Sequence, residues 1–133
     1  MSNQNFILNQ VQQSAIQKNI GTSVQILGKH LRETPEFQAY IAARLAVNED
    51  ITVQHLYQEI QQHQFALQWG QGDFEEHQEA FRRLSTEFEM LPLIQDYRKA
   101  MEEAHILFVN VDEIISKTAQ VPFAANAKKS CCG

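Results

Sequence analysis

The sequence has few of the residues that interrupt helices. Among its 133 residues are only five glycines and three prolines, and Pro35, Pro92 and Pro122 lie far apart. Glycine and proline are the least favourable residues inside a helix, so their scarcity leaves long segments that can be helical. No stretch alternates apolar and polar residues for long enough to predict a strand. At this length we expect a single domain.

Other absences exclude whole classes of function. The chain has no basic stripe, because its net charge is −5 and its neighbouring basic residues occur only as separate pairs. Proteins that bind nucleic acid need clustered positive charge to neutralise phosphates, so we expect no direct nucleic-acid binding. The chain also lacks an apolar run of about 18 residues and the charged and apolar regions of a signal peptide. We therefore expect no membrane insertion and a cytoplasmic location.

What the sequence does contain is apolar residues at helical spacing. Spacings of three and four residues recur in two neighbouring segments, first at Val53, Leu56, Ile60, His63 and Leu67, then at Phe74, His77, Phe81, Leu84 and Phe88. Between them, Gly70 suits the left-handed position after a helix, and Asp73 with Glu76 forms a capping box. Two such seams joined by a short turn predict a long antiparallel helical hairpin.

A longer seam follows Pro92, which can open a helix because the missing N–H of proline needs no partner there. Its members are Ile94, Tyr97, Met101, Ala104, Phe108, Val111 and Ile115. Earlier helices are indicated by Thr34 before Pro35 and by Asp50 as a cap. The sequence thus predicts an all-α bundle of about five helices. A single thin layer covers its apolar faces poorly, so we expect a dimer or hetero-oligomer with this seam as the interface.

The ends of the chain differ from the middle in composition. Residues 1–21 form an arm rich in Asn and Gln. Ile7, Val11 and Ala15 recur there at near-helical spacing, followed by Ile16 and Ile20, so the arm allows a short helix. The "GTS" at 21–23 is expected to break it, with Thr22 or Ser23 as the next N-cap. Residues 22–118 form the predicted helical domain. Residues 119–133 have small side chains and no periodicity, which predicts a flexible tail.

Residues that could carry out catalysis are not arranged in any familiar motif. No nucleophile motif, phosphate loop or zinc-ligand spacing is present. Glu102 and His105 match the Glu-x-x-His element of ferritin-like di-iron bundles, which use it twice, but Glu59 and His63 are four residues apart and do not supply a second copy. The seam histidines His63 and His77 allow either a metal site or a polar layer that fixes the helix register. We expect no enzyme.

The only cysteines, Cys131 and Cys132, are adjacent near the C-terminus. A disulfide between neighbours would strain the backbone, and two cysteines make no disulfide framework. They are either inert thiols or metal ligands. Zinc and iron–sulfur sites usually need four ligands, so a site would require cysteines from another chain.

Two segments resemble the YlbF/YmcA family. They are "FEMLPLIQDYRKAMEEAHILFVNVDEII", in which the run Leu91–Arg98 is the most specific part, and "TPEFQAYIAARLAVNED". The likeness covers residues 22–118. It implies an all-helical, often dimeric protein with a non-enzymatic role as a regulatory adaptor.

The resemblance also implies partners and a cofactor. In Bacillus-type bacteria two paralogues of this family join a third, unrelated protein in a complex that acts with the membrane-anchored ribonuclease Y in mRNA maturation. That complex also affects competence, biofilm formation and sporulation, and it holds iron–sulfur clusters through cysteines, several of them in C-terminal tails. Cys131 and Cys132 occupy a matching position, so the resemblance implies that they are ligands of a [4Fe-4S] cluster shared between subunits. The alternative is a homodimeric helical scaffold with an inert cysteine tail.

Overall fold

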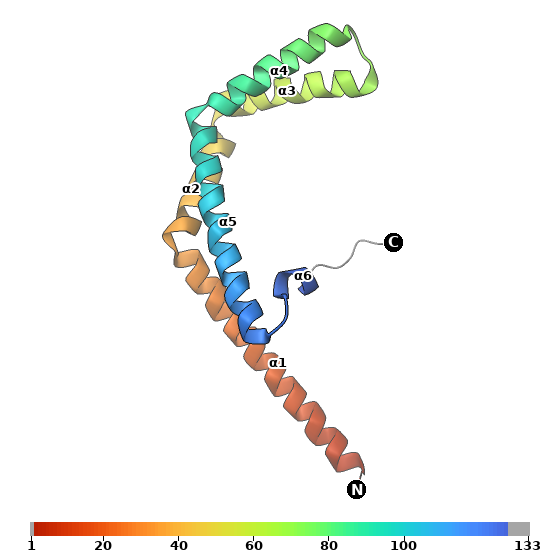
Figure 1. Cartoon of the computed structure of the whole chain (residues 1–133), viewed down its shortest axis with the longest axis vertical. Helices are drawn as coiled ribbons and strands as arrows, with labels where there is room; N and C mark the ends of the chain where they lie inside the picture. The colour runs from red at the N-terminus through yellow and green to blue at the C-terminus, as the bar shows by residue number, and fades with distance from the viewer. Residues whose placement is uncertain (1, 128–133) are drawn as a thin grey trace. The chain divides into compact units, whose positions relative to one another are not determined.

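The structure, a computed structural model, describes residues 2–127 (Figure 1). These residues contain no strand, which confirms the all-α class. They form six helices: α1 Ser2–Glu33, α2 Pro35–Glu49, α3 Ile51–Trp69, α4 Phe74–Met90, α5 Pro92–Ala119 and α6 Phe123–Ala127. The chain divides into two compact units, residues 1–38 and residues 39–133.

The first unit consists of α1 and the start of α2. Helix α1 runs without interruption through residues 21–23, so the break predicted there is wrong. The hydroxyl of Thr22 does not cap a new helix; its Oγ1 donates a hydrogen bond to the Lys18 carbonyl, 3.0 Å away, inside the same helix. Threonine can form this bond to the preceding turn as readily as it can form a cap. Consequently residue 21 is not a boundary between elements.

At the corner between α1 and α2, Thr34 caps the new helix and Pro35 begins it, as the sequence predicts. Pro35 is the first residue of α2. The Thr34 Oγ1 atom donates to the Leu31 carbonyl at 2.6 Å and accepts from the Phe37 N–H at 3.4 Å. A third polar bond closes the corner, because Gln38 Nε2 donates to the Arg32 carbonyl at 2.5 Å.

In the second unit, α3 and α4 pack against each other. The buried side chains of this pair are Val53, Leu56, Ala66 and Leu84. Most members of the two predicted seams are buried or half-buried, and the Tyr57 and Phe88 rings meet with centroids 6.2 Å apart. Phe74 is the exception, at 60 % exposed, because it lies in the first turn of α4 beside the loop.

The loop between α3 and α4 is built as its sequence predicts. Gly70 adopts the left-handed conformation at φ 62° and its N–H donates to the Ala66 carbonyl. The Asp73 carboxylate accepts from the Glu76 N–H at 3.0 Å and so caps α4. Gly72 also has a positive φ of 72°, and a Cβ there would lie 2.8 Å from His77 Nε2. The turn therefore requires glycine at two positions for different reasons.

Helix α5 begins at Pro92 without a side-chain cap and ends in a left-handed Gln120 at φ 59°. Beyond it, in the segment for which the sequence predicts a flexible tail, α6 forms a short helix that packs on α5. Its first N–H groups find acceptors on α5: the Phe123 N–H donates to Ser116 Oγ at 2.9 Å and the Ala124 N–H to Asp112 Oδ1 at 3.0 Å. These bonds order residues whose composition alone gives no helical signal.

Candidate functional site

The predicted interface seam on α5 divides into buried and exposed members. Ile94 and Ala104 are buried within the chain, at 3 % and 2 % exposed. Tyr97, Val111 and Ile115 are half-buried. Met101 and Phe108 keep 45 % and 41 % of their surface exposed although they continue the same spacing. The seam is therefore partly core, and its exposed members leave apolar surface on α5.

A groove borders the exposed part of this seam. It has a volume of about 510 Å³ and is lined by Val47 of α2, Phe88 of α4, and Ile94, Tyr97, Arg98, Met101 and Glu102 of α5. The lining is mostly apolar and includes two charged residues of α5, Arg98 and Glu102. Apolar recesses that include a few charged residues are typical of surfaces that bind other proteins.

Tyr97 belongs to both the seam and the groove. Its ring lies 6.0 Å from that of Tyr40, centroid to centroid. Burial, together with a hydrogen bond and the nearby charge of Tyr40, raises the pKa of Tyr97 above its ordinary value of 10.0, while Arg44 opposes the rise. The phenol therefore stays protonated at neutral pH and acts as a hydrogen-bonding group, not as a base.

The run Leu91–Arg98 forms the corner between α4 and α5. Gln95 Nε2 donates to the Glu89 carbonyl at 2.7 Å, and the Arg98 guanidinium forms an ion pair with the Glu89 carboxylate. Glu89 of α4 is thus bound to α5 through both its backbone carbonyl and its side-chain carboxylate. The most specific motif of the sequence has a structural function, because it fixes the corner next to the groove.

Two other corners are closed by glutamine in the same manner. Gln54 Nε2 donates to the Val47 carbonyl at 3.0 Å, between α2 and α3, as Gln38 does between α1 and α2. In each case the glutamine is the fourth residue of its helix. Sequence reasoning missed these bonds, although the shared pattern Pro-x-x-Gln at Pro35 and Pro92 could have signalled two of them.

Of the metal ligands that the sequence suggests, the described residues bring one predicted pair into contact. His63 and His77 meet, with their Nδ1 atoms 2.9 Å apart. Glu102 and His105 are both exposed on α5. Within residues 2–127 no group of three or more His, Cys, Asp or Glu side chains is placed to hold a metal ion. Cys131 and Cys132 lie outside the described residues.

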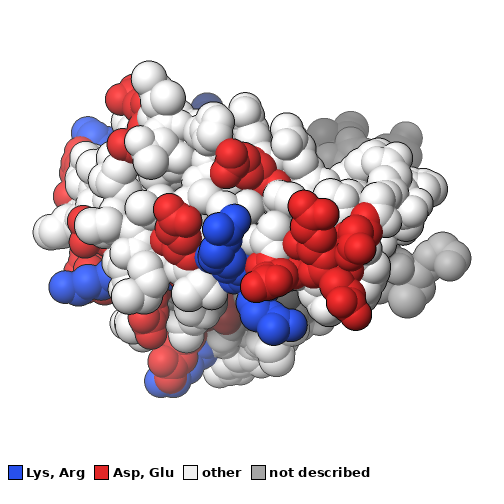
Figure 2. All heavy atoms as spheres, turned by 90° about the horizontal axis from the view of Figure 1, so that it is seen from above, with Lys and Arg blue, Asp and Glu red and all other residues white. Residues whose placement is uncertain are grey.

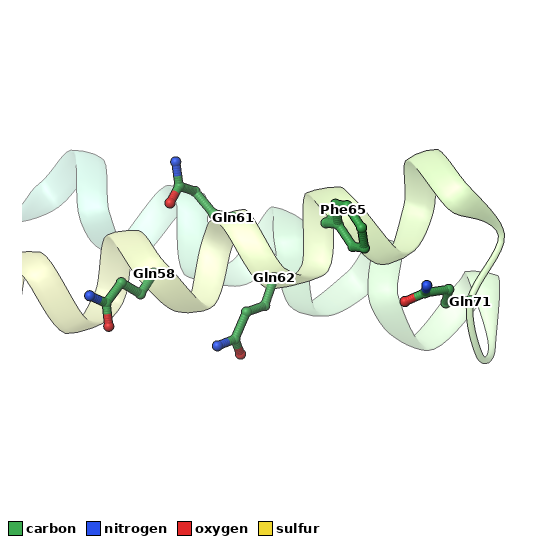
Figure 3. A pocket seen from close by; sticks show the side chains of 5 residues that line it. All are labelled: Gln58, Gln61, Gln62, Phe65 and Gln71. Atoms are coloured by element: carbon green, nitrogen blue, oxygen red, sulfur yellow. The ribbon is translucent and has the colours of Figure 1, made fainter.

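A second recess lies on α3 and the following turn. It has a volume of about 440 Å³ and is lined by Gln58, Gln61, Gln62, Phe65 and Gln71 (Figure 3). Phe65 and Trp69 are exposed, with ring centroids 6.0 Å apart. This recess offers amide groups that donate and accept hydrogen bonds and an aromatic surface. It contains no nucleophile or general acid that would indicate catalysis.

Charge is not segregated into a binding surface on the face that Figure 2 shows. Basic side chains lie beside acidic ones there, and several acidic side chains are gathered together next to two basic ones. This agrees with the separate basic pairs of the sequence and with its net charge of −5. Within the part of the chain that the structure describes, no helix is long and apolar enough to cross a membrane.

The described residues thus offer exposed apolar surface on helices whose corners are closed by hydrogen bonds, and exposed apolar surface is typical of proteins that act through contacts with other proteins. Comparison with protein families matches residues 20–120 to the family described as "Control of competence regulator ComK, YlbF/YmcA". The chain belongs to this family of regulators, as the resemblance of its sequence indicates. A comparison with curated individual proteins finds no match.

Proposed function

We propose that this chain is a non-enzymatic regulatory adaptor whose α5 face docks protein partners in a complex that affects ribonuclease Y-dependent mRNA processing. The observation that carries the proposal is the exposure of Met101 and Phe108 within an otherwise regular apolar seam. Fully burying an exposed apolar side chain is worth about 1.5–3 kcal/mol. A partner that covers the 45 % of Met101 and the 41 % of Phe108 that remain exposed would therefore gain roughly half of that at each residue. The expected partners are paralogous family members and the third protein of the complex.

The proposal extends to the cysteine tail. Cys131 and Cys132 would supply two thiolates, and a [4Fe-4S] cluster is usually held by four. The donor set therefore fits half of a site, and the other ligands would come from a second chain. Bound in this way, the cluster would link subunits at their tails, while the α5 face makes the protein contact.

The docking step is tested with charge substitutions on α5. Phe108→Glu should abolish co-purification with the paralogues and the third protein, because burying a carboxylate in an apolar interface is strongly unfavourable. Asn110→Glu is the matched control, since it adds the same charge at an exposed position of the same helix. Equal loss, or equal retention, of partners in the two variants would contradict the assignment of this face.

The cluster and the cellular role need separate measurements. Anaerobic purification of the chain with its partners should give visible absorption, iron and sulfide, all lost in Cys131→Ser/Cys132→Ser. Colourless, iron-free protein in every combination would refute the cluster. If the double variant keeps its partners and normal ribonuclease Y-dependent transcript processing, the alternative of a helical scaffold with an inert tail is supported instead.

A further inference from the structure

The contact between His63 and His77 is used by neither the docking face nor the cysteine tail. His63 comes from α3 and His77 from α4, both rings are half-buried, and their centroids are 5.1 Å apart. Their Nδ1 atoms face each other at 2.9 Å. One Nδ1 must donate while the other accepts, so the contact requires at least one ring with a free Nδ1 lone pair.

The loop fixes the orientation of this pair. Gly72 packs so closely on His77 that a Cβ at position 72 would lie 2.8 Å from the Nε2 atom. Nε2 is therefore the edge of the ring that faces the turn, and Nδ1 is the edge that faces His63. Packing that holds a ligand side chain in one orientation favours metal binding, because less freedom is lost when the ion is bound.

We propose that His63 and His77 form a two-imidazole site for a divalent transition-metal ion with tetragonal geometry, such as Cu(II) or Ni(II). At a metal–nitrogen length of 2.0–2.1 Å, ligands at a right angle lie roughly 2.8–3.0 Å apart, whereas tetrahedral ligands lie roughly 3.3 Å apart. The observed Nδ1–Nδ1 distance of 2.9 Å falls in the first range. The ion would replace the proton shared by the two Nδ1 atoms. Both rings would turn to direct their Nδ1 lone pairs at the ion, and the two helices would not need to separate.

The remaining coordination positions belong to water or to a ligand from outside, because no third His, Cys, Asp or Glu side chain within residues 2–127 joins the pair. The site is thus an open one, with exchangeable binding. Its effect would be local: an ion that bridges α3 and α4 next to their connecting turn stabilises the folded arrangement, by an amount that grows with the logarithm of its concentration once that exceeds Kd.

The test uses tag-free full-length protein carrying Cys131→Ser and Cys132→Ser, so that tail thiols do not bind the added metal. Calorimetric titration with NiCl₂ should show one equivalent of binding per chain. Both His63→Gln and His77→Gln should lose it, while His105→Gln, which changes an exposed histidine on α5, should keep it. Circular dichroism of each variant checks that the helices remain.

A second measurement needs no histidine variant. The electron paramagnetic resonance spectrum of the same chain loaded with one equivalent of CuCl₂ should show hyperfine coupling to two imidazole nitrogens. The proposal is overturned if no saturable binding occurs, if binding survives either His63→Gln or His77→Gln, or if the spectrum shows fewer than two such nitrogens. None of these results bears on the docking face or on the cluster, which are tested with other residues.

Discussion

The two glycines of the α3–α4 loop provide a matched experiment on the tip of this helix pair. Both have a positive φ, 62° at Gly70 and 72° at Gly72, but a Cβ at Gly70 would meet nothing within 4 Å. The left-handed conformation costs a residue with a Cβ about 1–2 kcal/mol in the folded state. Alanine also lowers the conformational entropy of the unfolded chain, which by itself stabilises the folded state by about 0.4–1 kcal/mol. Gly70→Ala should therefore lose about 1 kcal/mol of stability.

Gly72→Ala meets the same backbone cost and a steric one in addition. The new Cβ would lie 2.8 Å from His77 Nε2, so the ring must move and its contact with His63 is lost. Forced repacking costs typically 1–3 kcal/mol, which brings the expected loss to about 2–4 kcal/mol. In a His77→Ala background the clash is absent, and Gly72→Ala should cost only about as much as Gly70→Ala. The double-mutant cycle isolates this coupling.

Urea unfolding followed by Trp69 fluorescence is the appropriate assay. Trp69 is the single tryptophan of the chain and the last residue of α3, directly before Gly70. Its signal therefore reports on the tip itself, while circular dichroism reports on the helices as a whole. Equal destabilisation by the two alanine variants, or an unchanged cost of Gly72→Ala in the His77→Ala background, would refute the close contact between Gly72 and the imidazole.

Three further predictions concern other parts of the second unit. Gln95→Ala should destabilise the α4–α5 corner by about 1 kcal/mol, since it removes one hydrogen bond, and hydrogen exchange should speed up at residues 89–95 but not in the α3–α4 loop. The pKa of Tyr97 is raised in the folded state, so above pH 10 the folded state retains a proton that the unfolded state loses, and the free energy of unfolding should fall as pH rises further. Denaturant titration at pH 9–11 measures this decline. Tyr97→Phe should weaken the decline, and Tyr57→Phe should not. Asp112→Ala should loosen α6 by removing the acceptor of the Ala124 N–H, and faster exchange in residues 123–127 with unchanged exchange in α3 would be the result expected.

The features that the sequence predicts well are those determined by near neighbours. Asp50 caps α3 by accepting from the Val53 N–H at 2.8 Å, and Gly70 and Asp73 form the loop as expected, because caps and left-handed glycines depend on a few consecutive residues. Residues 21–23 show the limit of such reasoning. Glycine and threonine there are compatible with either a break or a continuing helix, and local pattern does not decide between them.

The features that the sequence does not predict depend on contacts between distant residues. The seam on α5 is regular in spacing, yet Ala104 is buried and Phe108 is 41 % exposed; periodicity identifies the apolar side of a helix without showing what covers each turn. Helix α6 likewise depends on Asp112, 12 residues before the N–H that it accepts. The sequence indicates that His63 and His77 lie near each other, because both belong to the apolar seams of neighbouring helices. It does not indicate the 2.9 Å distance between their Nδ1 atoms, which follows from the packing of α3 on α4.

The glutamine bonds at the helix corners have a consequence for experiments on binding. An amide that donates to a backbone carbonyl carries no net charge, so neither added salt nor a change of pH within the physiological range weakens it. Of the bonds described between α4 and α5, only the pair of Arg98 with Glu89 is sensitive to ionic strength. A partner whose affinity changes steeply with salt would accordingly be reporting charge contacts, either its own with this protein or the pair of Arg98 with Glu89, and not a loss of the glutamine bonds.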